Sequence, residues 1–334
     1  MSRITQVLIT VFCLLQLTNA SAGKQTLTIY TYDSFTSDWG PGPQVKKAFE
    51  EQCDCILEFV GLEDGVALLS RLKLEATNTK ADLILGIDTN LTAEARATGL
   101  IEPHQISTGP TTLPTDWKDT YFLPYDYGYF AFVYNKEILP NPPTSLKELV
   151  ESTDAPEILI QDPRTSTPGL GFLLWMKKVY GDEAHKAWVK LSKRVVTVSK
   201  GWSEAYGLFL KGEAPMVLSY TTSPAYHIIA EEDKRFAAAS FEEGHYQQIE
   251  VAGLIASSKK KALGREFLTF MMSEKFQSII PTTNWMYPAA LEQDQLPAAF
   301  KDLVKPGHTL LFKDTDIAKN RKQWISEWLE AMAE

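Results

Sequence analysis

Three of the eight tryptophans stand in short polar turns, and they are the first candidates for contact with a ligand. Trp39, Trp202 and Trp285 each lie next to a glycine or an asparagine. Such a tryptophan is well placed to face a cleft, although packing beneath a loop would use the same residue type. Six tyrosines extend the aromatic set: Tyr30, Tyr32, Tyr125, Tyr127, Tyr220 and Tyr226. Stacking and cation–π contacts would suit a flat, cationic or heteroaromatic ligand, and aromatic platforms also bind sugars.

Two hydroxyl-rich turns add polar chemistry to the aromatic set. In the segment 162–169, Ser166 is followed by Thr167, a good N-cap, and by Pro168, a good first residue of a helix. A second turn follows an apolar segment and consists of Tyr220, Thr221, Thr222, Ser223 and Pro224. Helix capping alone accounts for these residues, but a helix N-terminus also presents amides and hydroxyls to an anion. Two such turns in one lobe would suit a phosphate or a polar heterocycle.

The pair Asp64-Gly65 precedes an amphipathic segment that we expect to be helical. Asp64 could offer a carboxylate to an amino group of a ligand. It could equally cap the helix that follows, because aspartate is a preferred N-cap. The local sequence leaves both roles open.

Motifs for covalent catalysis and nucleotide binding are incomplete. Residues 201–205 lack the final glycine of a nucleophile elbow, and His227 and His245 stand in no distinctive context. A P-loop and a complete dinucleotide fingerprint are absent from the sequence. We therefore expect no enzyme, no catalytic residue, no cofactor and no metal site.

Two of the three cysteines, Cys53 and Cys55, lie two residues apart. A disulfide between them is favoured in an oxidising compartment, although it would close a very short loop. The alternatives are two free thiols or half of a metal site. The five histidines are scattered without ligand-like spacing, so the pattern favours the disulfide.

Predicted strands and helices alternate along the sequence, which is typical of an α/β fold. Short apolar segments predict strands at 26–32, 56–60, 81–87, 157–161, 195–199 and 216–220. Helical periodicity predicts helices after 41–43 and after 64–65, and at 92–98, 169–180, 183–192, 203–211, 261–272 and 314–332. The last helix carries one apolar stripe that we expect in the core: Trp324, Ile325, Trp328, Leu329 and Met332.

Two long segments without helical period, 121–135 and 248–256, are predicted to cross between two lobes. We expect lobe 1 to comprise 23–125 and about 250–300, lobe 2 to comprise 126–249, and a C-terminal helical segment, 301–334, to pack on the lobes. A chain of 334 residues is long enough for two lobes. Two α/β lobes joined by extended crossovers form a hinged clamshell, in which a ligand in the cleft favours closure.

The N-terminus and the charge of the chain bear on its location. Residues 1–22 read as a signal peptide, with a positive start, an apolar segment at 4–17 and a small-residue cleavage site at 20–22. The apolar segment is short for a membrane anchor and contains two glutamines. A formal net charge of −9 disfavours a nucleic-acid partner. We expect a free periplasmic protein without a membrane anchor.

Around these candidate residues the sequence resembles the periplasmic thiamine-binding proteins of ABC importers. The resemblance covers essentially the whole mature chain and implies the fold of that family, a two-lobed type II periplasmic-binding-protein clamshell. The matching stretches are 30–35, 38–43, 62–66, 126–134, 161–170, 200–212, 218–227 and 284–288.

The resemblance also implies roles and ligands. Trp202 and Tyr226 would sandwich a ring, Asp64 with Gly65 would meet the aminopyrimidine, and Ser166 with Thr167 would bind at a helix N-terminus. The turn from Tyr220 to Pro224 would line the same cleft, with Tyr32, Trp39 and Trp285 as further cleft residues. The implied ligands are thiamine, thiamine monophosphate and thiamine diphosphate, and the implied partners are a membrane permease and its ATPase. Thiamine is a permanent cation with two aromatic rings, which matches the aromatic and acidic residues.

Two other functions use a similar clamshell. Ferric-iron-binding proteins typically use an adjacent tyrosine pair, which this sequence lacks. Thiaminases use a cysteine nucleophile. After removal of the signal peptide only Cys53 and Cys55 remain, and we expect them away from the turns that face the cleft.

Overall fold

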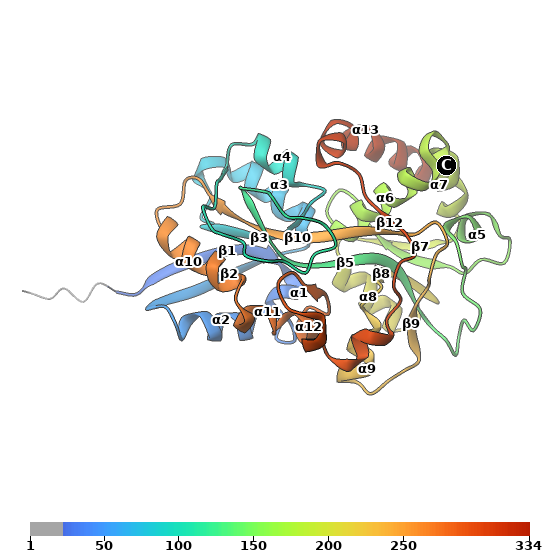
Figure 1. Cartoon of the computed structure of the whole chain (residues 1–334). Helices are drawn as coiled ribbons and strands as arrows, with labels where there is room; N and C mark the ends of the chain where they lie inside the picture. Colours follow the sequence, from blue (N-terminus) through green and yellow to red (C-terminus); the bar gives the residue numbers. More distant parts are fainter. Residues whose placement is uncertain (1–22) are drawn as a thin grey trace, which may run out of the picture.

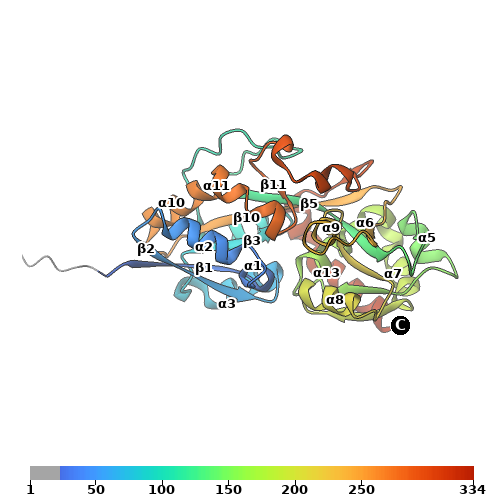
Figure 2. The same cartoon turned by 90° about the horizontal axis from the view of Figure 1, so that it is seen from below.

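The computed structural model describes residues 23–334, and the predicted signal peptide, 1–22, lies outside the described residues. Two α/β lobes lie side by side and share long strands (Figures 1 and 2). The main strands of both lobes are hydrogen-bonded in the order β2 (Cys55–Leu62), β1 (Gln25–Tyr32), β3 (Leu83–Asp88), β10 (His245–Ile255), β5 (Phe122–Asn135), β8 (Met216–Tyr220), β6 (Ile158–Gln161) and β7 (Val195–Ser199). The α/β class and the two-lobed arrangement predicted from the sequence are thus confirmed.

Lobe 1 is built on three parallel strands. Apolar side chains such as Ile29, Leu57 and Phe267 are fully buried between this sheet and its helices. The strands are β1 (Gln25–Tyr32), β2 (Cys55–Leu62) and β3 (Leu83–Asp88), with β1 paired to both neighbours. The helices are α1 (Asp33–Thr36), α2 (Gly42–Glu50), α3 (Gly65–Glu75), α4 (Thr92–Ala97), α10 (Lys261–Met271), α11 (Glu274–Gln277) and α12 (Ile280–Thr283).

Lobe 2 repeats this plan. Phe172, Trp175 and Trp188 are buried in its core and form edge-to-face pairs. The parallel strands are β6 (Ile158–Gln161), β7 (Val195–Ser199) and β8 (Met216–Tyr220). The helices are α5 (Leu146–Glu151), α6 (Thr167–Tyr180), α7 (Ala184–Ser192), α8 (Trp202–Leu210) and α9 (Pro224–Ala230).

Two long antiparallel strands, β5 (Phe122–Asn135) and β10 (His245–Ile255), join the lobes. β10 pairs with β3 in lobe 1, and β5 pairs with β8 in lobe 2. The predicted crossovers are therefore confirmed, but β10 begins three residues before the predicted start at 248. His245 can lie in this buried strand because its Nδ1 forms a hydrogen bond of 2.7 Å with the carbonyl oxygen of Phe130. That bond compensates for the burial of a polar side chain.

The remaining elements are short. They were not predicted from the sequence, because a segment of two to five residues is too short to show a hydrophobic period. The short strands are β4 (Ile101–Glu102), β9 (Phe236–Ala238), β11 (Tyr287–Pro288) and β12 (Thr309–Leu310). Single 3-10 turns cover Ala76–Asn78, Gly181–Glu183, Gln293–Gln295 and Ala298–Asp302. Among residues 23–334, no helix has both the length and the apolar character that crossing a bilayer requires.

The C-terminal helix α13 (Asp314–Ala333) packs against α7 of lobe 2 and α4 of lobe 1 (Figure 1). Trp328 is buried as predicted, but Leu329 is 39 % exposed, and Ile317 and Ala331 are buried in its place. The prediction for Leu329 is wrong because this residue lies about 100° around the helix from Trp328, beyond the edge of the buried face. The limits given above for the lobes and for segment 301–334 stay predictions.

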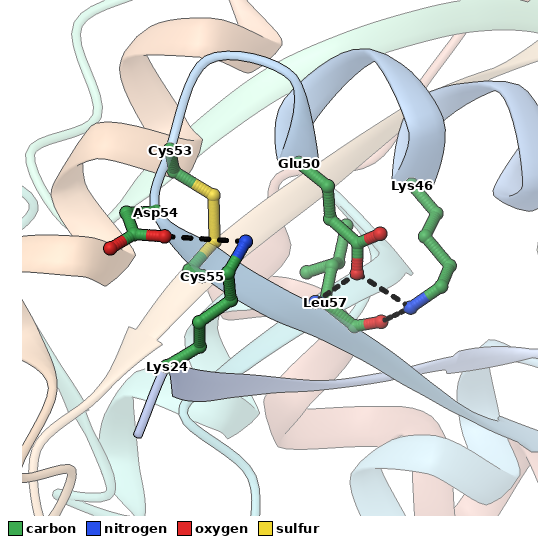
Figure 3. Close-up of a disulfide and its surroundings, with 7 residues drawn as sticks. All are labelled: Lys24, Lys46, Glu50, Cys53, Asp54, Cys55 and Leu57. Carbon is green, nitrogen blue, oxygen red and sulfur yellow. Dashed lines mark hydrogen bonds and ion pairs between the residues drawn. A yellow bond between two sulfur atoms is a disulfide. The ribbon is translucent and has the colours of Figure 1, made fainter. Parts of the chain in front are cut away.

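Cys53 and Cys55 are joined by a disulfide between the end of α2 and the start of β2, with Cα atoms 5.2 Å apart (Figure 3). The loop is held from outside by the ion pair of Lys24 with Asp54 at 3.2 Å. Cleft-facing residues follow the other end of β2, roughly 25 Å away along the strand. The disulfide therefore secures a corner of lobe 1 and lies far from the cleft.

Replacing both cysteines with serine (C53S/C55S) is expected to leave ligand affinity unchanged, because the disulfide is remote from the cleft. The loss of stability should be small, about 1–2 kcal/mol, since so short a loop restricts the unfolded chain little. Thermal unfolding and calorimetric titration check both statements. A large loss of affinity with normal folding would contradict the assignment of the disulfide to structure alone.

Candidate functional site

A cleft opens between the lobes, where the carboxyl ends of strands from both lobes meet. This edge is where open α/β sheets usually hold their ligands. Glu63 and Asp64 follow β2, whereas Trp202 and Tyr226 come from α8 and α9 of lobe 2, and all four line the cleft. The cleft encloses about 1270 Å³ of empty space, its open mouth included. It therefore has room for a ligand of two rings.

Trp202 forms one aromatic wall with Tyr206, which lies one helical turn further along α8. Their rings stack with centroids 4.9 Å apart and planes 26° apart. The indole Nε1 of Trp202 donates a hydrogen bond to Ser219 Oγ at 2.8 Å, and Trp39 approaches from lobe 1 with a ring separation of 6.3 Å. Helix α8 begins at Trp202, one residue before the predicted start. The ring is thus fixed in orientation while one side of it faces the cleft.

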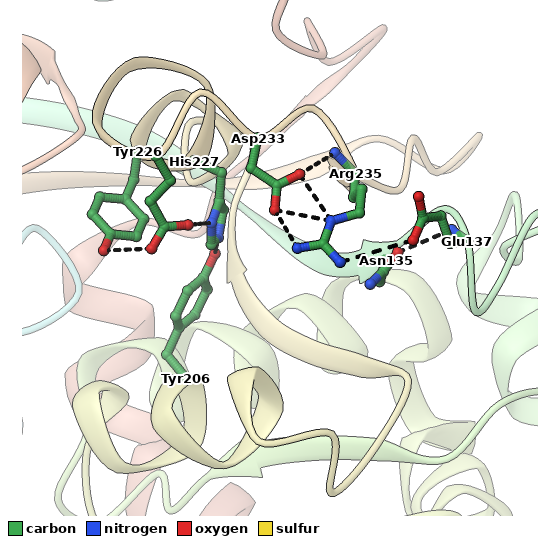
Figure 4. Close-up of polar contacts among 8 residues, drawn as sticks. Asn135, Glu137, Tyr206, Tyr226, His227, Asp233 and Arg235 are labelled. Carbon is green, nitrogen blue, oxygen red and sulfur yellow. Dashed lines mark hydrogen bonds and ion pairs between the residues drawn. The ribbon is translucent and has the colours of Figure 1, made fainter.

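Tyr226 and Trp285 form a second aromatic group, with ring centroids 5.4 Å apart and planes at 71°. The Tyr226 hydroxyl donates to Glu231 at 2.9 Å (Figure 4). Glu231 also bonds His227 Nδ1 at 2.6 Å, and His227 Nε2 meets the Tyr206 hydroxyl at 2.9 Å. Burial lowers the pKa of His227. One chain of hydrogen bonds therefore links Tyr226 to Tyr206 and so to the wall that Trp202 forms.

Asp64 bridges the lobes. It is the N-cap of α3, and its Oδ1 accepts from the amides of Gly65 at 2.8 Å and Thr167 at 3.2 Å. Its Oδ2 accepts from Ser166 Oγ at 2.8 Å and from the Trp202 amide at 3.3 Å. The carboxyl group thus sits at the N-termini of α6 and α8, which both favour negative charge. Burial raises the pKa of Asp64, and these hydrogen bonds oppose that rise.

Glycine allows the lobes to touch at two points beside Asp64. A Cβ on Gly65 would lie 2.4 Å from the Gly86 carbonyl oxygen and 2.4 Å from Thr167 Oγ1. A Cβ on Gly201 would lie 2.7 Å from the Glu63 carbonyl oxygen. Any larger residue at either position would hold the lobes apart.

The turn after β8 lies mostly behind the cleft surface. Tyr220 and Ser223 line the cleft, whereas Thr221, Thr222 and Pro224 are buried beneath it. Ser223 Oγ bonds Ser219 Oγ at 2.7 Å, the same hydroxyl that accepts from Trp202. The turn therefore supports the Trp202 wall, and only Tyr220 and Ser223 face the cleft.

The floor of the cleft holds a polar cluster around Tyr32. Its hydroxyl donates to Glu250 Oε2 at 3.0 Å and lies 3.1 Å from the Tyr125 hydroxyl. Asn284 Nδ2 lies 3.0 Å from the same Tyr32 oxygen and 2.6 Å from Asp126 Oδ2. Trp285, next along the chain, has a positive φ of 58°. This backbone conformation is strained for a tryptophan, and the ring lies beside Tyr226.

The lining is acidic. Glu63, Asp64 and Glu250 face the cleft, and no lysine, arginine or histidine is among the lining residues from the described part of the chain. An anionic group would therefore have to be held by amides and hydroxyls, whereas a cation meets carboxyl groups directly. In residues 23–334 no group of three or more His, Cys, Asp or Glu side chains could hold a metal ion.

The structure brings eight of the fourteen candidate residues to the cleft surface and leaves six behind it. Those at the surface are Tyr32, Trp39, Asp64, Trp202, Tyr220, Ser223, Tyr226 and Trp285. Those behind it are Gly65, Ser166, Thr167, Thr221, Thr222 and Pro224. Ser166 rather than Thr167 caps α6, so the predicted cap is wrong by one residue. A bond to Asp64 across the lobe boundary holds Ser166 in that position.

Sequence reasoning missed several cleft residues. Tyr206 could have been found from its spacing, because it lies four residues after Trp202 on one helix. Glu250 could have been found as a charge in the middle of an apolar crossover strand. Asn284 and Met286 flank Trp285 and gave no separate signal. The other missed lining residues are Ser34, Glu63, Pro168, Ser203, Gly207, Leu210 and Thr283.

The family model described as "Bacterial extracellular solute-binding protein" matches residues 42–278. The chain belongs to this family. A solute-binding protein of this kind is not an enzyme, so the prediction of no catalytic function is confirmed by the family.

Two relatives of this solute-binding protein carry the same name. The thiamine-binding periplasmic protein of Brucella suis biovar 1 (strain 1330) is 58% identical over 320 residues, which cover 96% of each chain. The protein of the same name from Escherichia coli (strain K12) is 58% identical over 310 residues, 93% of this chain and 94% of the relative. The resemblance seen in the sequence and the predicted periplasmic location are thereby confirmed.

A solved structure named "Periplasmic thiamin binding protein" superposes with a TM-score of 0.92 at 58% sequence identity. The match covers 94% of this chain and 98% of that chain. The periplasmic-binding-protein clamshell predicted for this solute-binding protein is therefore confirmed.

Proposed function

We propose that this protein binds thiamine in the cleft, binds thiamine monophosphate and thiamine diphosphate there as well, and delivers them to the permease and ATPase of an ABC importer. The observation that carries the proposal is the pairing of aromatic walls with an acidic lining to which the described residues contribute no basic side chain. Thiamine is a cation with two aromatic rings, so it gains from both features. The names of the relatives point to the same ligand.

The donors around Asp64 support a site for the phosphates. Two helix N-termini, those of α6 and α8, direct amides at one point, and Ser166 adds a hydroxyl. A phosphate would take the same donors, since helix N-termini commonly bind anions. Asp64 accepts hydrogen bonds from these donors, and it would have to turn away when a phosphate enters. Thiamine itself has no such group and would leave Asp64 in place.

Closure of the clamshell would connect binding to transport. Asp64 and the two glycine contacts join the lobes, and a ligand that contacts Trp39 and Trp202 together would favour closure. A permease that recognises the closed form would then receive the loaded protein.

Calorimetric titration with thiamine, thiamine monophosphate and thiamine diphosphate tests the proposal. We expect saturable binding of all three at micromolar protein. Binding of thiamine alone would remove the two phosphates from the proposal. Failure of all three to bind would overturn it.

Ser166→Ala is expected to weaken the two phosphates more than thiamine, because the serine hydroxyl would donate to the phosphate. Loss of one hydrogen bond to a charged group corresponds to about 1.5–3 kcal/mol. The measurement is the ratio of the dissociation constants of thiamine diphosphate and thiamine in the variant and in the wild type. Equal weakening of both ligands would show that the turn does not bind the phosphate.

A further inference from the structure

Two carboxyl groups face each other at the floor of the cleft, where the crossover strands pair. Asp126 on β5 and Glu250 on β10 are opposite one another in the register of these strands. Both are buried, with 0% and 5% of their surface exposed, and Glu250 lines the cleft. Glu250 Oε2 accepts hydrogen bonds from Tyr32 at 3.0 Å and from Tyr125 at 2.9 Å. The pair therefore lies at the hinge and at the ligand site together.

One oxygen of this pair lacks an ordinary donor. Asp126 Oδ2 accepts from Asn284 at 2.6 Å, but Oδ1 is buried without any amide, hydroxyl or amine donor in the described part of the chain. Its partner in the strand register is Glu250, the second buried carboxyl group of the pair. A proton on either carboxyl group would supply the missing donor, and burial strongly disfavours two neighbouring negative charges. The ligand-free pair therefore keeps at least one proton.

The surroundings keep that proton in place. Within residues 23–334, the titratable or polar groups that act most strongly on the pair come from β1, β3, β5, β8 and the segment after α12. None of these groups is basic: Tyr32, Asp88, Tyr125, Tyr220 and Asn284. Burial raises the pKa of Asp126 to about 7. Burial and the negative charge of Asp126 hold the pKa of Glu250 well above its usual range. The pair thus changes its charge close to neutral pH.

We propose that the Asp126–Glu250 pair is the charge-recognition element of the cleft, and that a cationic heterocycle binding beside Glu250 displaces a proton from the pair into solvent. The proton leaves a carboxyl oxygen, and the negative charge that remains faces the cation. This proposal rests on the proposed function, since it requires a cationic ligand in the cleft. A cation favours the ionised form of a neighbouring acid.

The sign of the pH dependence follows from linkage. The ligand-free pair holds more protons than the complex, so binding releases protons, and the affinity rises with pH through the range in which the pair titrates. One linked proton gives at most a tenfold change in affinity for each pH unit. We therefore expect thiamine to bind roughly tenfold more tightly at pH 8 than at pH 6.

The test is calorimetry of thiamine binding to the full mature protein at pH 7 in two buffers that differ in ionisation enthalpy. The wild type is expected to release a measurable fraction of one proton per ligand. Glu250→Gln keeps the shape of the side chain, cannot ionise and offers Asp126 an amide donor that favours its ionised form. It should therefore release no proton and lose most of the pH dependence of binding. Its affinity at pH 8 should fall about tenfold. Glu58→Gln makes the same change on the exposed face of β2 and should behave as the wild type.

The outcomes separate this proposal from the proposed function. Thiamine binding with no proton release by the wild type would overturn the proposal and leave the proposed function standing. Proton release that persists in Glu250→Gln and in Asp126→Asn would also overturn it. No binding of thiamine to the wild type would instead overturn the proposed function. If Glu250→Gln fails to fold by thermal unfolding, the wild-type proton count and Asp126→Asn decide the question.

Discussion

Trp202→Ala is expected to weaken thiamine binding by roughly 1–3 kcal/mol, because a buried aromatic contact in a ligand site often contributes that much. The side chain forms the wall of the cleft together with Tyr206 and approaches Trp39 across the lobe boundary. Its removal takes away one ring face and the contact that spans the cleft. The Trp202 amide stays in place, so the donor to Asp64 is retained.

The measurement is a calorimetric titration of variant and wild type, with thermal unfolding to show that the variant is folded. Trp324→Ala is the matched control, because it removes the same side chain from α13, where Trp324 packs on Phe312 away from the cleft. It is expected to lose some stability and to retain its affinity. Unchanged affinity in Trp202→Ala would mean that Trp202 is a packing residue only.

Asp64→Asn is expected to shift the preference of the cleft toward the phosphorylated ligands. The carboxylate competes with a phosphate for four donors, and asparagine carries no charge and offers one acceptor oxygen in place of two. Thiamine should bind more weakly, since the cleft loses an acidic group. The ratio of affinities for thiamine diphosphate and thiamine should rise about tenfold, which corresponds to about 1.4 kcal/mol.

Glu63→Gln is the matched control for this variant. Glu63 also lines the cleft and is adjacent in sequence, but its side chain is exposed and accepts none of these four hydrogen bonds. If competition for the donors causes the shift, Asp64→Asn should change the ratio far more than Glu63→Gln. Equal shifts would show that net charge alone sets the preference and that Asp64 does not occupy a phosphate site.

Much of the fold could be predicted because its signals are local. Strand β8 begins and ends at the predicted residues, and α10 differs only at its last residue, since apolar periodicity and turn residues mark both ends. The start of β10 could not be predicted. His245 and Gln247 look like loop residues until β5 supplies a hydrogen bond to the His245 ring and backbone pairing to Gln247, and both residues become buried. Leu329 shows the opposite case, an apolar residue left outside the buried face of its helix.

The candidate site divides in the same way. The tryptophans and the Asp64 turn could be found from the sequence because such residue types are unusual beside glycine at the ends of strands. The contacts of Asp64 with Ser166 and Thr167 could not be found, because they join residues about a hundred positions apart in different lobes. Glu250 and Asp126 come together only through strand pairing, which a single sequence does not reveal.

The glycine contacts beside Asp64 suggest one way in which related binding proteins change their transport properties during evolution. Gly65 and Gly201 let the backbone of one lobe rest on the other. A change at either position would alter the balance between open and closed forms while every ligand-facing side chain stayed the same. Selection for faster release or for scavenging at low vitamin concentration could therefore act on these two glycines without altering chemical specificity. Related proteins with identical cleft residues could then differ in uptake kinetics through this lobe contact alone.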